Sequence, residues 1–208
     1  IFLFFVFDIF FDFFEFTLPF KERGKGRMNK VRLKFKWATE ILGTENIGLL
    51  ILTDELEQRQ LTVPCDRNMM YQFSVRMSHL PIADRMIPEV LWEVISTQTD
   101  LKFEIFINDL IDGQYRAMLY NTETLVPIAM RASDAVLLAF ISKTIPLYIE
   151  EGLFRRQSVE YHKEATGVSI PLNTISDEML QNALQKAVEE EKYELASHLR
   201  DVFLAGPH

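Results

Sequence analysis

The chain has 208 residues, of which 48% are hydrophobic and 25% charged, and Cys65 is its single cysteine. This length and composition fit one globular core with an appendage and exclude collagen-like and fully disordered proteins. A single cysteine excludes a disulfide framework and fits a reducing compartment. The 22 basic and 30 acidic residues give a net charge of −8, which excludes a protein that coats nucleic acid with positive charge, so any such contact must use a local patch.

Residues 1–27 differ in composition from the rest of the chain, since ten of the 17 phenylalanines lie within 1–20. The segment lacks the basic start and small-residue cleavage site of a signal peptide. The cost of inserting its three acidic residues into a membrane roughly offsets the favourable free energy of inserting its apolar residues. Every residue of 21–27 can be encoded by purines, as in a bacterial ribosome-binding site. We therefore interpret 1–27 as translated upstream sequence, with Met28 as the native start and a membrane anchor as the alternative.

Residues 28–157 show the hydrophobic pattern of an α+β domain. Alternation of basic and apolar side chains opens this stretch and is typical of a half-buried strand. Three strands are predicted over 30–37, 47–53 and 60–65, followed by helices over 68–78 and 84–97. Asp84 is the expected N-cap of the second helix.

The same order of elements then occurs a second time. Strands are predicted over 101–108, 115–121 and 125–130, with helices over 134–143 and 150–157 and a short extended piece over 146–149. Asp112-Gly113 indicates a two-residue hairpin turn, and Ser133 is the expected cap of the helix that follows. Two units of three strands and two helices predict an internal duplication and a mostly antiparallel sheet with packed helices.

The C-terminal quarter reads as an acidic appendage. Residues 158–176 contain glycine and two prolines and are predicted to be a linker, and the apolar spacing over 177–208 predicts a helical hairpin. Nine acids and four bases give residues 158–208 a charge of −5, whereas residues 28–157 carry 17 acids and 14 bases and hence only −3. The net charge of the main domain therefore repels nucleic-acid phosphates less strongly than the net charge of the whole chain would.

Four motifs of the main domain occur in an order that resembles the bifunctional nuclease domain family, over about residues 30–156. They are LPIADRMIPEVLWEVI at 80–95, EIFINDLIDGQYRAMLY at 104–120, RASDAVLLAF at 131–140 and IPLYIEEGLF at 145–154. The resemblance implies a bacterial, cytoplasmic nuclease that cleaves RNA and DNA with little sequence specificity. Where the family usually has Ile-Gly-x-x-Glu-Ala, this chain reads CDRNMM at 65–70, a departure that puts activity in doubt if that glutamate is catalytic.

The tail AVEEEKYELASHLRD at 187–201 resembles the UVR motif, a helical hairpin of excision-repair subunits and of Clp-type chaperones and their adaptors. The motif resemblance spans about residues 177–203. It implies a protein partner, which we expect to be contacted by Tyr193, Leu199 and Arg200. The competing hypothesis is accordingly a non-catalytic adaptor that docks such a chaperone or repair subunit.

Hydrolysis of a phosphodiester bond requires an activated water and neutralisation of the developing negative charge, commonly by Mg²⁺ or Mn²⁺ between carboxylates with help from arginine. The candidates for this catalysis are Arg131, Asp134, Asp84 and Asp109, with Asp112 and His79 as weaker ones. Helix capping, turn formation and surface exposure are the structural alternatives for these residues. Arg131 and Asp134 are favoured because they place a base and an acid at one strand-to-helix junction.

The basic face of the first strand is the clearest candidate for binding nucleic-acid phosphates. It consists of Lys30, Arg32, Lys34 and Lys36, and its alternative role is to protect an edge strand from aggregation. Apolar helix faces also suggest a homodimer. No spacing of cysteine and histidine predicts a zinc site, and no P-loop or dinucleotide-binding motif is present.

Overall fold

The computed structural model describes residues 29–40 and 47–161, together with some residues between 181 and 200. The expected start at Met28 and the whole of segment 1–27 lie outside the described residues. The elements are β1 (Lys30–Glu40), β2 (Ile47–Asp54), β3 (Arg59–Asp66), α2 (Arg67–Met77), η1 (Ala83–Arg85), α3 (Ile87–Gln98), β4 (Phe103–Ile111), β5 (Gln114–Asn121), β6 (Pro127–Arg131), α4 (Ala132–Ser142), β7 (Leu147–Glu150), α5 (Glu151–Gln157) and β8 (Val159–Glu160).

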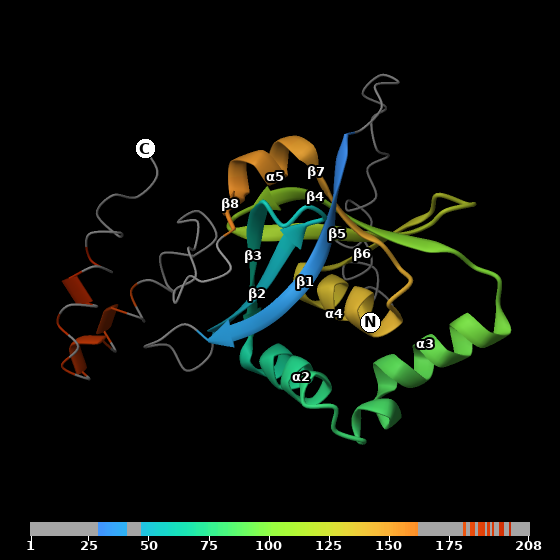
Figure 1. Cartoon of the computed structure of the whole chain (residues 1–208), viewed down its shortest axis with the longest axis horizontal. Helices are drawn as coiled ribbons and strands as arrows, with labels where there is room; N and C mark the ends of the chain where they lie inside the picture. Colours follow the sequence, from blue (N-terminus) through green and yellow to red (C-terminus); the bar gives the residue numbers. More distant parts are fainter. Residues whose placement is uncertain are drawn as a thin grey trace, which may run out of the picture.

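The strands form one eight-stranded sheet in the order β6-β5-β4-β7-β1-β2-β3-β8 (Figure 1). All neighbouring pairs are antiparallel except β4 and β7, which run parallel. The prediction of a mixed fold with a mostly antiparallel sheet is therefore confirmed. Each half begins with an antiparallel meander that leads directly into a helix, β1-β2-β3 into α2 and β4-β5-β6 into α4. The duplication itself stays a prediction.

The hairpin between β4 and β5 turns at Asp112-Gly113, as the sequence predicts. Asp112 has φ of 51° and Gly113 has φ of 72°, and Ile111 pairs with Gln114 across the turn. Two central residues with positive φ are typical of a type I′ turn, whose twist matches that of the flanking strands.

Two expected helix caps are wrong. Asp84 lies inside the 3₁₀ turn η1, and α3 begins after Met86 with Pro88 in its first turn. Proline favours this position because its φ suits a helix and its missing N–H would have no partner there. Ser133 is a buried residue in the first turn of α4, which follows Arg131 without a side-chain cap, since β6 continues straight into the helix.

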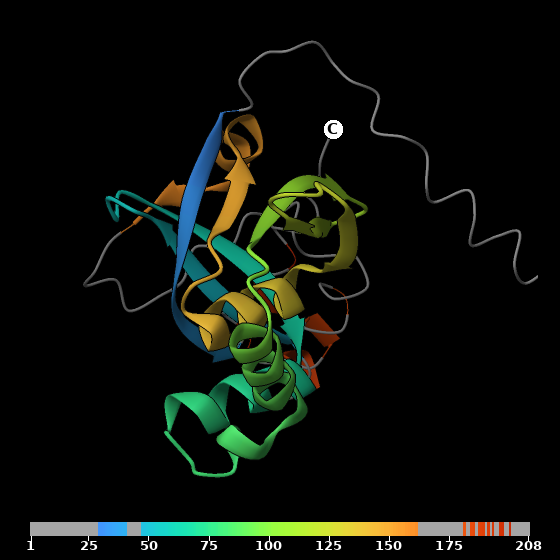
Figure 2. The same cartoon turned by 90° about the vertical axis from the view of Figure 1, so that its right-hand side faces the viewer.

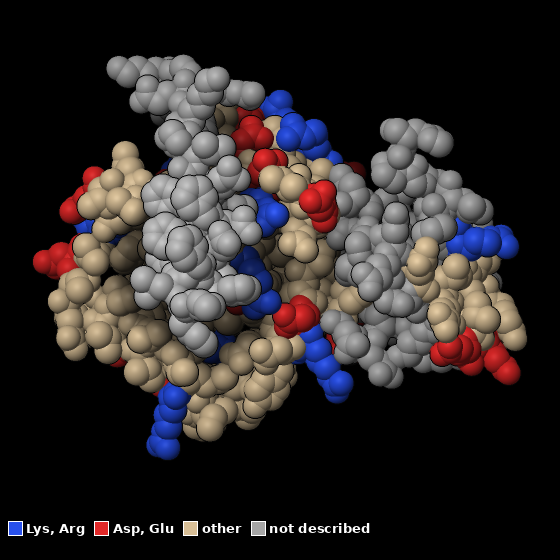
Figure 3. Space-filling model, turned by 180° about the vertical axis from the view of Figure 1, so that it is seen from behind, with Lys and Arg blue, Asp and Glu red and all other residues tan. Residues whose placement is uncertain are grey.

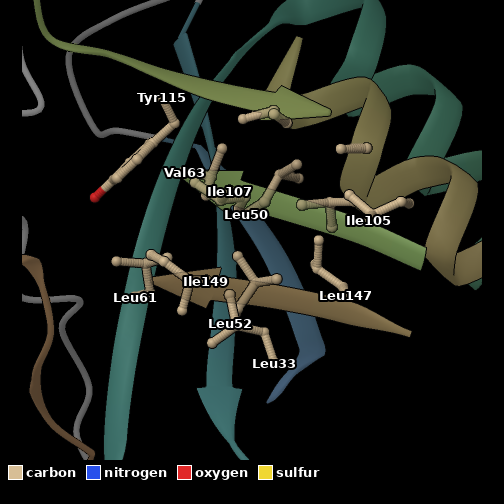
Figure 4. Packing of buried hydrophobic residues seen from close by; sticks show 14 of the residues in the cluster. Leu33, Leu50, Leu52, Leu61, Val63, Ile105, Ile107, Tyr115, Leu147 and Ile149 are labelled. Atoms are coloured by element: carbon tan, nitrogen blue, oxygen red, sulfur yellow. The ribbon is translucent and has the colours of Figure 1, made fainter. Parts of the chain in front are cut away.

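The hydrophobic core lies between α4 and the inner face of the sheet. Helix α4 contacts β3 as well as β4, β5, β6 and β7, and because β3 and β6 lie near opposite edges of the sheet, the sheet must curl around the helix. Aliphatic side chains from neighbouring strands meet here (Figure 4), among them Leu33, Leu50, Leu52, Leu61, Val63, Ile105, Ile107, Leu147 and Ile149. Helix α3 lies outside this layered arrangement (Figures 1 and 2).

Strand β8 pairs with β3 through Gln60 and Val159. The sheet therefore extends into the first residues of the segment predicted to be a linker. The predicted hairpin over 177–208 lies largely outside the described residues. In the described part of the chain, no helix is long and apolar enough to span a membrane.

Candidate nucleic-acid site

A cleft of about 950 Å³ opens where the end of β3 and the β6–α4 junction approach the β4–β5 hairpin. Polar residues from these elements line it, including Asp66, Asp109, Arg116 and Arg131. Seen from behind, basic side chains lie in a hollow of the surface and acidic side chains lie beside them (Figure 3). Both charges are therefore present at one concave surface, as hydrolysis of a phosphate ester requires.

Arg131 stands at the centre of the charged groups. Its Nε and one terminal nitrogen donate to the two carboxylate oxygens of Asp134 at 2.6 and 3.2 Å, and its other terminal nitrogen donates to Asp66 at 3.0 Å. A guanidinium has five N–H groups, so these three bonds leave one free N–H on each terminal nitrogen. The side chain is 63% exposed, and the free N–H groups are thus accessible to a phosphate oxygen.

The two carboxylates also set the protonation of Arg131. The hydrogen bond and the charge of Asp134 raise the pKa of the guanidinium above its ordinary value, and Asp66 adds to this in the same direction. Arg131 therefore carries its positive charge at every pH at which the protein would act.

Asp66 reaches this site because it ends β3 and caps α2. One of its carboxylate oxygens accepts the backbone N–H of Met69 at 2.8 Å, while the other accepts from Arg131. Our sequence reasoning missed Asp66 as a site residue, although it stands at a strand-to-helix junction like that of Arg131 and Asp134. That parallel placement is the signal that could have found it.

The β4–β5 hairpin adds a second arginine to the cleft. In the sheet register, Arg116 lies opposite Asp109 on one side and opposite Arg131 on the other. Directly opposite residues of antiparallel strands share a face, so these three residues form a row across β4, β5 and β6. Asp109, a catalytic candidate from the sequence, therefore lies at the cleft, whereas Arg116 was not singled out from the sequence.

Three polar atoms of this hairpin are buried without a hydrogen-bond partner: Asn108 Oδ1, the Tyr115 hydroxyl and Arg116 Nε. All three residues line the cleft. Burial raises the pKa of the Tyr115 hydroxyl, so it stays protonated and able to donate. Tyr115 lies at the edge of the core with its oxygen directed away from the aliphatic cluster (Figure 4).

Cys65 precedes Asp66 and also lines the cleft, but its thiol is unsuited to act as a nucleophile. Burial, followed by the charge of Asp66, raises the pKa of Cys65 to about 12. Since the thiolate is the reactive form, the thiol is inert near neutral pH.

The remaining predicted site residues are dispersed. Asp84 lies in η1 and does not line the cleft. On the basic face of β1, glutamates pair with three of the four cations: Lys30 with Glu104 at 2.8 Å, Arg32 with Glu55 at 3.5 Å and Lys36 with Glu57 at 2.5 Å. This leaves Lys34 as its one cation without an ion pair among the described residues.

The residues predicted to contact a protein partner lie at the edge of the described part of the chain. Tyr193 is helical and exposed, and Arg200 is also helical and exposed. Leu199 lies outside the described residues.

No group of three or more histidine, cysteine, aspartate or glutamate side chains that would hold a metal ion occurs among the described residues. Asp66 and Asp134 bring two carboxylates together, since both accept hydrogen bonds from Arg131. Mg²⁺ is often held by only one or two carboxylates together with substrate phosphates. This donor set therefore fits an ion that arrives with its substrate better than a resident one.

A family model described as the bifunctional nuclease domain matches residues 50–162. The match covers more than half of the chain and runs from within β2 to the end of β8, so it contains every residue of the cleft except Ile47. A comparison with curated proteins found no match.

Proposed function

Because this chain belongs to the bifunctional nuclease domain family, we propose that it hydrolyses phosphodiester bonds of RNA and DNA, with little sequence specificity, at the cleft around Arg131. The observation that carries the proposal is the arrangement of Arg131 itself. Two carboxylates hold the guanidinium, and two of its N–H groups remain free at an exposed concave surface. Such preorganised donors stabilise negative charge that develops on a phosphate.

In this proposal Arg131 contacts the phosphate that is attacked, and Asp134 and Asp66 orient it. Asp109 lies in the same row of residues and is the carboxylate available to accept a proton from the attacking water, since among the described residues its side chain accepts a hydrogen bond only from the adjacent backbone N–H of Leu110. Asp84 is left out of the site because it does not line the cleft.

We include Mg²⁺ or Mn²⁺ as the cofactor. Asp66 and Asp134 are the residues that would hold it, together with oxygens of the substrate. When bound, such an ion supplies Lewis-acid stabilisation of the phosphate.

The test is a nuclease assay on the purified full chain with single-stranded RNA and DNA, with Mg²⁺, with Mn²⁺ and with chelator. We expect Asp134→Asn and Arg131→Gln each to lower kcat/KM by roughly 10²-fold or more. Asp100→Asn serves as the matched control, because Asp100 is an exposed aspartate outside the cleft. A folded wild-type chain without activity under all these conditions would refute the nuclease proposal.

An adaptor function is the second candidate, favoured by the exposed Tyr193 in the UVR-like tail. In that case Tyr193, Leu199 and Arg200 contact a Clp-type chaperone or an excision-repair subunit. Binding of a purified chaperone of this class, lost in Tyr193→Ala and in Leu199→Ala while no substrate is cleaved, would support the adaptor. Cleavage that depends on Arg131 would decide against it as the sole function.

We also propose that the chain forms a homodimer through the apolar face of η1 and α3. Seven large apolar side chains between residues 80 and 101 are exposed there: Leu80, Ile82, Ile87, Val90, Leu91, Val94 and Leu101. A standard interface buries about 800 Å² of each partner, and these exposed apolar side chains would form the centre of such an interface. A second copy presents the same face, as a two-fold interface requires.

A further inference from the structure

The unpartnered polar atoms of the β4–β5 hairpin set the cleft apart from the rest of the interior. The described residues contain six buried side-chain atoms without a hydrogen-bond partner. Three of them, on Asn108, Tyr115 and Arg116, line the cleft, and the other three, on Thr53, Thr62 and Gln157, do not. Half of these atoms are thus concentrated on one hairpin at one surface.

Such groups cost folding free energy because they lose water without gaining a partner. Tyr115 is the clearest case, since the residue is only 5% exposed and its hydroxyl nevertheless points out of the aliphatic cluster toward no acceptor (Figure 4). A phenylalanine would fill the same space without this cost. The hydroxyl is therefore explained if a bound molecule supplies its partner.

Arg116 differs from Arg131 in having no carboxylate partner. It forms no ion pair with the described residues, although Asp109 lies opposite it in the sheet. Its neighbour in the register on the other side is Arg131. An anion that binds between the two strands would be attracted by both guanidinium groups.

The cleft has the size and lining for one nucleotide. Its volume of about 950 Å³ lies within the range of ordinary small-molecule sites. Apolar side chains, among them Val63, Pro64, Met118 and Met130, line it beside the charged ones. An unstacked base can pack on such a surface, whereas the bases of a duplex are stacked within the helix and are not available.

We propose that Arg116, Tyr115 and Asn108 form a nucleotide subsite that holds the residue next to the scissile phosphate and thereby selects single-stranded nucleic acid. Arg116 binds the flanking phosphate, and the Tyr115 hydroxyl and the Asn108 amide hydrogen-bond to the sugar or the base. The inference rests on the proposed function and names its substrate class. All three are positioning residues, since none is assigned to the reacting atoms.

The first test measures binding to the full chain in chelator, where a metal-dependent cleavage does not occur, by fluorescence anisotropy with a labelled single-stranded oligonucleotide and with its duplex. We expect the single strand to bind at least tenfold more tightly than the duplex, and Arg116→Gln to raise the Kd for the single strand about tenfold. Arg85→Gln is the control, because Arg85 lies in η1 outside the cleft and its loss changes the net charge equally.

The second test separates ligand binding from folding. Tyr115→Phe removes only the unpartnered hydroxyl, so we expect the urea midpoint to stay or rise while the Kd for the single strand increases about threefold or more. Thr53→Val removes a buried unpartnered hydroxyl away from the cleft and should leave the Kd unchanged.

Equal binding of duplex and single strand, or unchanged Kd values in both Arg116→Gln and Tyr115→Phe, would overturn the subsite. If the wild type cleaves nucleic acid while these variants bind normally, the nuclease proposal stands and the subsite alone fails. If the wild type binds the single strand through Arg116 and Tyr115 but never cleaves it, the subsite stands and the hydrolytic function fails.

Discussion

Helices α3 and α4 have nearly the same length, 12 and 11 residues, and both carry an apolar face, yet they differ in how deeply they are buried. Six residues of α4 are buried, whereas none of α3 is. Helix α4 lies against the curled sheet (Figures 1 and 2), while Ile87 at the start of α3 remains 74% exposed. Periodicity thus predicts that a helix forms and which side is apolar, but not what covers that side.

Helix α3 is attached to the rest of the domain by few contacts. Arg76 of α2 donates two hydrogen bonds to the carboxylate of Glu89, at 2.6 and 2.7 Å, and its side chain is only 4% exposed. Trp92 packs against the core from the inner side of the helix. A buried, bidentate ion pair therefore helps to hold α3 to the domain, whereas aliphatic packing holds α4.

The largest effect on stability is expected from breaking this ion pair. Glu89→Ala would leave the Arg76 guanidinium buried without its carboxylate, which should lower the free energy of unfolding by about 3–5 kcal/mol. Urea unfolding followed by circular dichroism measures this, with Glu93→Ala as the control on the same helix, because Glu93 is exposed. A loss equal to that of the control would mean that α3 does not depend on the ion pair.

The two helices can be compared directly by one substitution made in each. Leu137 of α4 is 6% exposed and Leu91 of α3 is 56% exposed. Leu137→Ala should cost about 2–5 kcal/mol of unfolding free energy because it leaves a cavity, whereas Leu91→Ala in the monomer should change it by less than about 0.5 kcal/mol. Equal losses at low protein concentration would show that the face of α3 is covered within one chain.

The homodimer proposal predicts that a charge on α3 acts on association instead of folding. Leu91→Lys should raise the dimer dissociation constant roughly tenfold or more, with the urea midpoint of the monomer nearly unchanged. Sedimentation equilibrium of the full chain measures the amounts of monomer and dimer. A wild-type chain that stays monomeric across the micromolar range would remove the second copy as the partner of this face.

At the exposed start of α4 we expect a substitution to lower activity strongly while it changes the free energy of unfolding only slightly. Asp134→Asn removes the pairing with Arg131 and a negative charge at the helix N-terminus, which at so exposed a pair should cost only about 0.3–1 kcal/mol. Differential scanning calorimetry would then show a small shift in Tm beside the large loss of activity proposed above. A loss of several kcal/mol would mean that Asp134 is structural.

The effect of Cys65 is expected only in alkaline solution and is absent near neutral pH. Its thiol has an ordinary pKa of 9.0 and is raised to about 12 in the folded chain. The folded state thus favours the protonated thiol, so the contribution of Cys65 to stability is complete below pH 9 and declines as the pH rises from 9 toward 12. Cys65→Ala should lack this decline in urea unfolding measured at several pH values, and identical pH profiles would contradict the raised pKa.

Local chemistry was sufficient to predict several elements of the domain. The alternation over 30–37, the Asp112-Gly113 turn and the apolar run that became α4 all depend on interactions within a few residues, which sequence patterns report. The pairing of Arg131 with Asp134 was accessible in the same way, because the two residues are one helical turn apart. The two expected caps failed because Pro88 and the direct passage from β6 into α4 determined where those helices begin.

The sequence by itself determined an α+β chain with a hairpin at Asp112-Gly113 and an acid and a base at the start of α4. Only the tertiary structure decided that Asp66, 65 residues away, completes the pairing of Arg131, and that glutamates of β4 and of the β2–β3 turn pair with three of the four cations on the basic face of β1. It also decided that α4 is buried while α3 is exposed. The physical reason is that these contacts arise from the curl of the sheet, which brings distant strand ends together and leaves no periodic trace in the sequence.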